Sequence, residues 1–138
     1  MSYDYDSIVA GLVYDRTEPV PYTHTDRNRV EYATEAMAAL VNELGYYISI
    51  TTKTDWANIA TRTWANWVSK ENISRYLGNV QLLRNQFFGY GNIQIPPTIY
   101  DIDYVGANAI EYYLSGIPTI KEDIENHYRR CNTFNCGT

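Results

Sequence analysis

The stretch that decides the fold is TDRNRVEYATEAMAALVNELG, residues 25–45. Its apolar residues recur mostly at steps of three or four, which is the spacing of one face of an α-helix. They are Val30, Ala33, Met37, Leu40, Val41 and Leu44. Thr25 and Asp26 supply an N-cap and an acidic first turn, and Gly45 stands where helices commonly end. The pattern predicts an amphipathic helix over residues 25–44.

Weaker helical patterns lie on the C-terminal side of this stretch. Apolar spacing from Ile73 to Phe87 predicts a second helix that ends near residue 88, and it starts either after a Ser69 cap or within the helically spaced residues 64–68. Apolar spacing also predicts a third helix over 105–114, and a Thr-x-x-Glu capping box predicts a fourth over 119–129. The segments between them are rich in proline, threonine and tyrosine. Residues 46–52 are aromatic and β-branched, so they fit either a short strand or an extended linker packed across a helix.

The expected fold is mainly α: three or four helices in a small bundle with long extended connectors and at most one or two short strands. We divide the chain into an extended N-terminal arm (residues 1–25), a helical repeat bundle (26–130) and a C-terminal tail (131–138). A chain of 138 residues is long enough to bury one core without disulfides or metals.

Composition excludes several classes of protein. The net charge is −5, with 11 basic against 16 acidic residues, so we expect no nucleic-acid binding, which needs clustered Lys and Arg. No stretch is long and apolar enough to predict a membrane span, and the acidic start is unlike a signal peptide. Tyrosine is over-represented, with 14 Tyr against 3 Trp and 3 Phe. Because tyrosine is amphipathic and rigid, this bias indicates a surface that contacts another molecule.

The helical segments contain an internal repeat. Asn-Arg-Val-Glu-Tyr at residues 28–32 returns as Asn-Ala-Ile-Glu-Tyr at 108–112, and a related Arg-then-apolar step lies at 75–76. Each unit follows a polar extended run, so the recurring polar side chains could satisfy the backbone amides of a connector that crosses the helix. We therefore expect one set of residues to hold connectors against helices: Asn28, Arg29, Glu31, Arg75, Asn79, Asn108 and Glu111.

Four blocks of motifs follow one another along residues 12–138. They are DRT at 15–17 with YTHTDRNRVE at 22–31, KTDW at 53–56 with RYLGNV at 75–80, PP at 96–97 with YVGANAIE at 104–111, and TFNCG at 133–137. In this order they resemble domains of minor structural and tail-fibre-associated or baseplate-associated proteins in phages and prophages of Firmicutes. The chain departs from the family pattern at Arg27, where leucine is usual, at residues 106–108, and at residues 130–132 of the tail.

The resemblance implies a non-enzymatic virion structural protein, acting by subunit assembly in a tail, baseplate or fibre. It implies other tail or baseplate proteins as partners, a homo-oligomer, residence in the virion tail after assembly in the host cytoplasm, and no cofactor. No catalytic residue is attached to these motifs. The first alternative is a carbohydrate- or receptor-binding module of the tail tip, in which exposed aromatics such as Trp56, Trp64 and Trp67 stack on cell-surface glycans. The second is a cell-wall-cleaving enzyme.

Enzymatic chemistry and metal binding have few candidates. A hydrolase needs paired carboxylates in a cleft, and the candidates by count are Asp101 with Asp103 and the acidic residues of 122–125. Helix capping and a solvated helix face account for both groups, so we expect no catalytic residue. His127, Cys131 and Cys136 fall one ligand short of a zinc site, so we expect no metal, and the two cysteines could instead form a local bridge.

The remaining aromatic residues are candidates for an interface. They lie in the extended or terminal segments rather than in the helical stripes, and an extended connector of this kind is either packed across its own helices or presented to a neighbouring subunit. The interface candidates are Tyr3, Tyr5, Tyr14, Tyr22, Tyr46, Tyr47, Tyr90, Tyr100, Trp56, Trp64 and Trp67.

Overall fold

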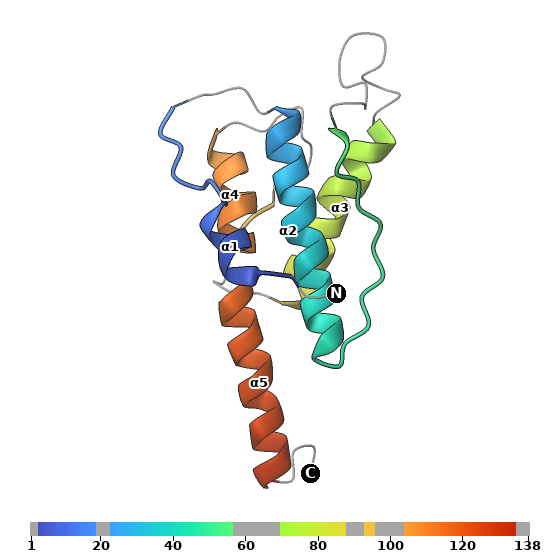
Figure 1. The fold of residues 1–138 in the computed structure, drawn as a ribbon, viewed down its shortest axis with the longest axis vertical. Coiled ribbons are helices and arrows are strands. Elements are labelled where there is room, and N and C mark those ends of the chain that lie inside the picture. The colour runs from blue at the N-terminus through green and yellow to red at the C-terminus, as the bar shows by residue number, and fades with distance from the viewer. Residues whose placement is uncertain (1–2, 19–22, 57–69, 88–92, 96–103, 135–138) are drawn as a thin grey trace.

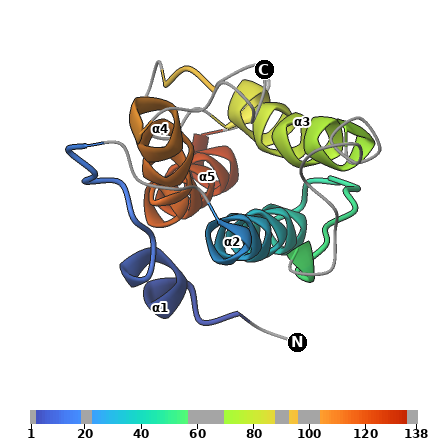
Figure 2. The same ribbon diagram turned by 90° about the horizontal axis from the view of Figure 1, so that it is seen from above.

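A computed structural model describes residues 3–18, 23–56, 70–87, 93–95 and 104–134, with the backbone alone at 70, 71, 104 and 127–134. These residues contain five helices: α1 (Tyr5–Ala10), α2 (His24–Glu43), α3 (Lys70–Gln86), α4 (Tyr104–Leu114) and α5 (Ile117–Phe134). The mainly α fold class is therefore confirmed. Helix α2 contacts each of the other four helices, and α5 extends away from the bundle at its C-terminal end (Figures 1 and 2).

Helix α2 carries the core and forms as its apolar stripe predicts. Its buried residues include Val30, Met37 and Leu40, each no more than 1% exposed. The start differs by two residues from the prediction. Thr23, rather than Thr25, precedes the helix, and its backbone N–H and hydroxyl donate to the Asp26 carboxylate at 2.9 and 3.2 Å.

The end of α2 is a Schellman motif. Gly45 has φ 105°, a left-handed conformation that a residue with a Cβ adopts only with strain. The N–H of Tyr46 then donates to the carbonyl of Val41 at 3.0 Å, and that of Gly45 to the carbonyl of Asn42 at 3.2 Å. This turn reverses the chain, so the connector that follows runs back alongside α2 (Figure 1).

That connector is extended, and none of its described residues forms a strand. The linker alternative for residues 46–52 is therefore correct. Asn42 holds it at the start, accepting from the Ile48 N–H at 2.7 Å and donating to the Ile48 carbonyl at 2.9 Å. Further along, the Thr52 hydroxyl donates to Glu35 at 3.1 Å. Residues 48–56 thus pair with α2 in antiparallel order.

Two predicted boundaries are wrong. The N-terminal arm is not extended throughout, because residues 5–10 form α1, which Asp4 caps by accepting from the Ser7 N–H at 3.2 Å. Helix α5 begins at Ile117 rather than Thr119 and continues to Phe134, beyond the predicted bundle limit at residue 130. Pro118 lies in its first turn, where the missing N–H costs no hydrogen bond.

Candidate functional site

Glu31 of α2 is 1% exposed and is surrounded by donors from two other segments. Arg75 of α3 binds it with both terminal nitrogens, at 2.8 and 2.7 Å. The backbone N–H of Lys53 donates to the same carboxylate at 3.2 Å, and the indole N–H of Trp56 donates at 2.8 Å. A buried carboxylate needs such donors, since leaving its charge unpaired in the interior costs several kcal/mol.

Asn28 lies one turn before Glu31 and extends the same contact. Its side-chain oxygen accepts from the backbone N–H of Trp56 at 3.0 Å. The helix residues Asn28 and Glu31 thus bind two connector amides, those of Trp56 and Lys53, that are themselves three residues apart. We call Asn28, Glu31, Lys53, Trp56 and Arg75 the Glu31 cluster.

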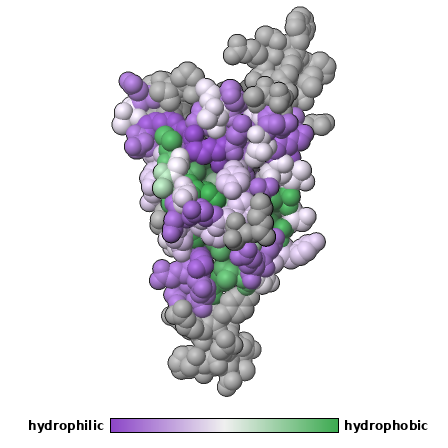
Figure 3. Space-filling view, in the orientation of Figure 1, coloured by the Kyte–Doolittle hydropathy of each residue, from purple (hydrophilic) through white to green (hydrophobic). Residues whose placement is uncertain are grey.

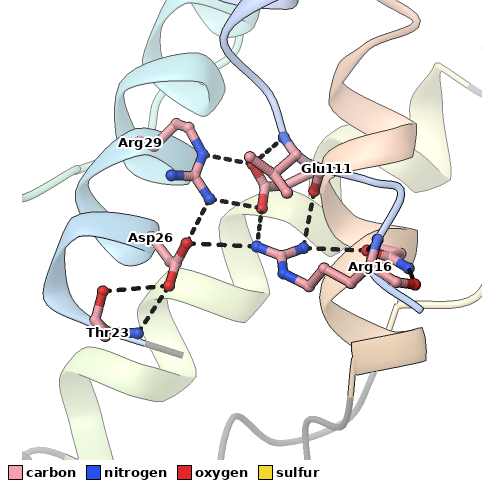
Figure 4. A network of polar contacts seen from close by, with 7 residues as sticks. Arg16, Thr23, Asp26, Arg29 and Glu111 are labelled. Carbon is pink, nitrogen blue, oxygen red and sulfur yellow. Dashed lines mark hydrogen bonds and ion pairs between the residues drawn. The ribbon is translucent and has the colours of Figure 1, made fainter. Parts of the chain in front are cut away.

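Glu111 of α4 is fully buried and repeats this arrangement with residues from the N-terminal arm (Figure 4). It accepts from the backbone N–H of Val13 at 2.9 Å and from the Arg16 guanidinium at 2.8 Å. Arg29 of α2 binds both of its oxygens, at 2.6 and 2.9 Å. One turn earlier, Asn108 accepts from the Arg16 N–H at 3.2 Å and donates to the Arg16 carbonyl at 2.9 Å.

The two clusters have the same layout. In each, a glutamate and an asparagine three residues before it bind two connector amides, again three residues apart. Arg29 takes the place of Arg75, as the arginine from an adjoining helix, and Arg16 takes the place of Trp56, as the connector side chain. We call Val13, Arg16, Arg29, Asn108 and Glu111 the Glu111 cluster.

Asp26 is an additional member on the Glu111 side. It accepts from Arg29 and lies 3.4 Å from Arg16, so the two arginines face two carboxylates (Figure 4). Burial raises the pKa of Asp26, but the Thr23 amide and the two guanidinium groups outweigh it, so that the net pKa is lowered. The Glu111 carboxylate in turn raises the pKa of Arg29.

Arg75 and Asn79 also hold the middle of the connector after α2. Both donate to the carbonyl of Thr51, at 2.9 Å from Arg75 and 2.7 Å from Asn79. All seven residues expected from the repeat therefore contact a connector or bind another of the seven. Arg16 and Trp56 were not expected as partners of these seven residues, although Arg16 belongs to the DRT motif and Trp56 to the KTDW motif, which precede the helices.

The aromatic residues expected at an interface differ in how far the structure exposes them. Trp56 is 1% exposed and donates to Glu31, so its assignment to an interface or to glycan stacking is wrong. Tyr14 and Tyr46 are about two-fifths exposed and Tyr47 is 90% exposed, whereas Tyr3 and Tyr5 are half-buried. The other candidates lie outside the described residues: Tyr22, Tyr90, Tyr100, Trp64 and Trp67.

Tyrosines of the arm and connectors pack within the chain. The ring of Tyr14 lies 5.6 Å from that of Tyr112 on α4, and the ring of Tyr46 lies 5.0 Å from that of Phe87. Of the two arrangements expected for the connectors, packing across the chain's own helices is the one observed in these pairs. Contact with a neighbouring subunit stays a prediction for their exposed edges.

One hollow in the described part of the chain brings carboxylates together. A cavity of about 470 Å³ between α1 and α5 is lined by Asp4, Asp6, Glu122 and Glu125. A hydrolytic pair needs a general acid with a raised pKa. The Ser7 hydroxyl and amide instead lower the pKa of Asp4, and Glu125 pairs with Lys121 at 3.5 Å. These observations do not favour glycoside hydrolysis there.

The other residues expected in catalytic or metal sites lie wholly or partly outside the residues that the structure describes. Asp101 and Asp103 lie outside the described residues, as do the side chains of His127, Cys131 and Cys136. Within the part that is described, no group of three or more His, Cys, Asp or Glu side chains could hold a metal ion. No helix in that part is long and apolar enough to cross a membrane.

Comparison with known proteins adds no relative. No protein-family profile matches the chain, and neither the curated proteins nor the solved structures contain a significant match.

Proposed function

We propose that this chain is a non-enzymatic structural component of a phage or phage-like tail, as part of the tail, baseplate or fibre. The observation that carries the proposal is the use of its motif residues. The side chains through which the sequence resembles tail proteins, such as Arg16, Glu31, Trp56 and Glu111, are engaged in buried internal bonds. They stabilise a scaffold and leave recognition to the surface.

The surface of α4 offers a place for assembly. Val105 is 59% exposed and Tyr112 is 42% exposed on the same face of the helix, and Tyr14 packs against Tyr112 while remaining 42% exposed itself. Elsewhere, polar residues cover much of the face seen in Figure 3, and apolar residues reach the surface in small separate areas. Exposed aromatic and aliphatic groups are typical of the central part of a protein interface.

Incorporation into particles tests the proposal. Particles purified from a host that expresses the chain should contain it, by mass spectrometry and by antibody labelling at the tail in electron micrographs. The double variant Val105→Ser/Tyr112→Ser should be incorporated less, whereas Tyr47→Ser, which alters an exposed tyrosine elsewhere, should be incorporated normally. Particles complete without the chain, or clearing of cell walls by the purified protein in zymograms, would contradict the proposal.

Glycan binding is the second candidate function. In that case the chain binds a cell-surface saccharide, either instead of other tail proteins or in addition to them. This function is favoured by one observation, an open groove beside α2 that combines tyrosine rings with carboxylate, amide and hydroxyl groups.

A further inference from the structure

The groove beside α2 lies between that helix and the connector that returns along it. Its volume is about 290 Å³, at the small end of the ~300–1,000 Å³ range of ligand pockets. Two alanines of α2 and two isoleucines of the connector supply apolar lining. The aromatic and polar residues of the lining are Tyr3, Glu35, Asn42, Tyr47, Ser49 and Thr52.

Tyr47 is the most exposed large hydrophobic residue among the described residues, at 90%. The adjacent residue is held firmly, because Asn42 makes two hydrogen bonds with the backbone of Ile48, whose side chain is buried. The backbone that carries Tyr47 is therefore anchored while its ring stays in solvent at the groove. The anchored backbone removes part of the ordering cost of binding, and the rotamer freedom of the exposed ring is the part that a stacking ligand still has to offset.

Glu35 supplies the charge in this groove. Its carboxylate accepts from the Thr52 hydroxyl at 3.1 Å. Burial and a hydrogen bond to Glu35 both raise the pKa of the Tyr3 hydroxyl, which places Tyr3 at the same carboxylate. A carboxylate has about four lone-pair sites, so Glu35 can accept further bonds from a ligand. Hydrogen bonds to a charged acceptor are stronger than those between neutral groups.

Charge narrows the class of ligand. Of the described residues that line the groove, Glu35 is the one Asp, Glu, Lys, Arg or His, and the whole chain has a net charge of −5. Anionic saccharides and phosphates would be repelled by both. A ligand with hydroxyl or ammonium donors and an apolar C–H face would match the carboxylate and the tyrosine ring together.

We propose that this groove binds a ring of a neutral or amino sugar. Tyr47 stacks on the C–H face of the sugar, Tyr3 closes the groove on the side of α2, and Glu35 accepts from hydroxyl or ammonium groups of the sugar. The inference rests on the second candidate function, glycan binding, and not on the tail assignment.

Titration of the isotope-labelled chain with glucose, galactose, N-acetylglucosamine and glucosamine, followed by amide NMR shifts, tests the proposal. At least one sugar should give saturable shifts in residues 47–52, with a dissociation constant of about 1 mM. Tyr47→Ala should weaken binding by about tenfold or more and Glu35→Gln by a smaller factor. Tyr112→Ala removes an exposed ring outside the groove and should leave binding unchanged.

Three outcomes would overturn it. One is the absence of saturable shifts with all four sugars up to about 50 mM. Another is equal binding by the wild type and Tyr47→Ala, whose fold is checked by its unchanged amide spectrum elsewhere. The third is movement of the same amides with protein concentration alone, which would assign the groove to self-association. None of these outcomes changes whether the chain is found in particles.

Discussion

Glu31 and Glu111 occupy equivalent positions in two repeats, yet they are neutralised in different ways. At Glu31, one arginine supplies the positive charge, and the connector contributes the neutral indole N–H of Trp56. At Glu111, the connector contributes a second arginine, Arg16, and Asp26 is present to balance it. Among the carboxylates and guanidinium groups that bind one another, formal charges therefore cancel on both sides, one with one at Glu31 and two with two at Glu111 and Asp26.

This comparison separates what the fold needs from how a residue provides it. The fold needs a buried acceptor on the helix, two connector amides bound three residues apart, and zero net charge. The connector side chain can be charged or neutral, provided that the surrounding charges change with it. Because a buried unpaired charge is costly, a change from Trp56 to arginine would need a second acid nearby.

The third repeat, carried by α3, shows neither arrangement among the residues that the structure describes. Leu77 of α3 stands where α2 has Glu31, and Ala109 of α4 stands where α2 has Arg29. Helices α3 and α4 are joined instead by the Tyr113 hydroxyl, which donates to the Phe87 carbonyl at 2.6 Å. Among the described residues, a neutral hydrogen bond thus stands at this junction, where each of the other two has an ion pair.

The largest effect should come from removing the acceptors. Glu111→Ala would leave Arg16 and Arg29 with Asp26 alone, so we expect a loss of about 4–5 kcal/mol in the free energy of unfolding. Glu31→Ala leaves one arginine, and we expect about 3 kcal/mol. Urea denaturation followed by circular dichroism measures both.

Glu125→Ala is the control for those two variants. Glu125 is a partly exposed glutamate paired with Lys121, so its removal should change stability by less than about 0.5 kcal/mol. If Glu31→Ala were as stable as this control, the connectors would not depend on the buried carboxylates. If Glu31→Ala lowered the free energy of unfolding more than Glu111→Ala did, the second arginine at Glu111 would not make the loss of its carboxylate more destabilising.

The sequence predicts the scaffold of these clusters but not their full membership. The periodicity of α2 and the recurrence of Asn and Glu three residues apart suffice to place Asn28, Glu31, Asn108 and Glu111 against connectors. Arg16 meets Glu111 across 95 positions of sequence, and no local pattern selects that pair. Helix α1 was missed because six residues are too few to show a helical period.

Replacing the asparagines should also destabilise the Glu111 side more than the Glu31 side, by a smaller difference in the free energy of unfolding. Asn108 makes three hydrogen bonds with Arg16, two to its backbone and one to its guanidinium, whereas Asn28 accepts from the Trp56 N–H. We expect Asn108→Ala to cost about 2 kcal/mol and Asn28→Ala about 1 kcal/mol in thermal or urea unfolding. Equal thermal stability of wild type and Asn28→Ala would remove the structural role that the repeat predicts for it.

The smallest expected effect is a pH dependence of stability that comes from the Glu111 cluster and not from the Glu31 cluster. Asp26 belongs to the Glu111 cluster alone, and its pKa is lowered from 3.8 in the folded chain. The unfolded chain therefore takes up this proton at a higher pH than the folded one, so the stabilisation is complete above about pH 4 and is lost as the pH falls through the folded pKa. Asp26→Asn should be less stable than wild type at neutral pH, by only about 0.5 kcal/mol, because Arg29 and Asp26 are partly exposed and solvent screens the charge that is left on the arginines.

The two proteins should converge as the pH falls below 3.8, because protonation removes from the wild type the charge that the variant already lacks. Urea midpoints measured from pH 7 to pH 2.5 give the difference directly. The exposed Asp123→Asn, which removes one negative charge from α5, controls for net charge and should follow the wild type at every pH. A difference between Asp26→Asn and wild type that stays constant across this range would mean that Asp26 contributes through its shape or as a helix cap, and that the second arginine of the Glu111 cluster does not need its charge.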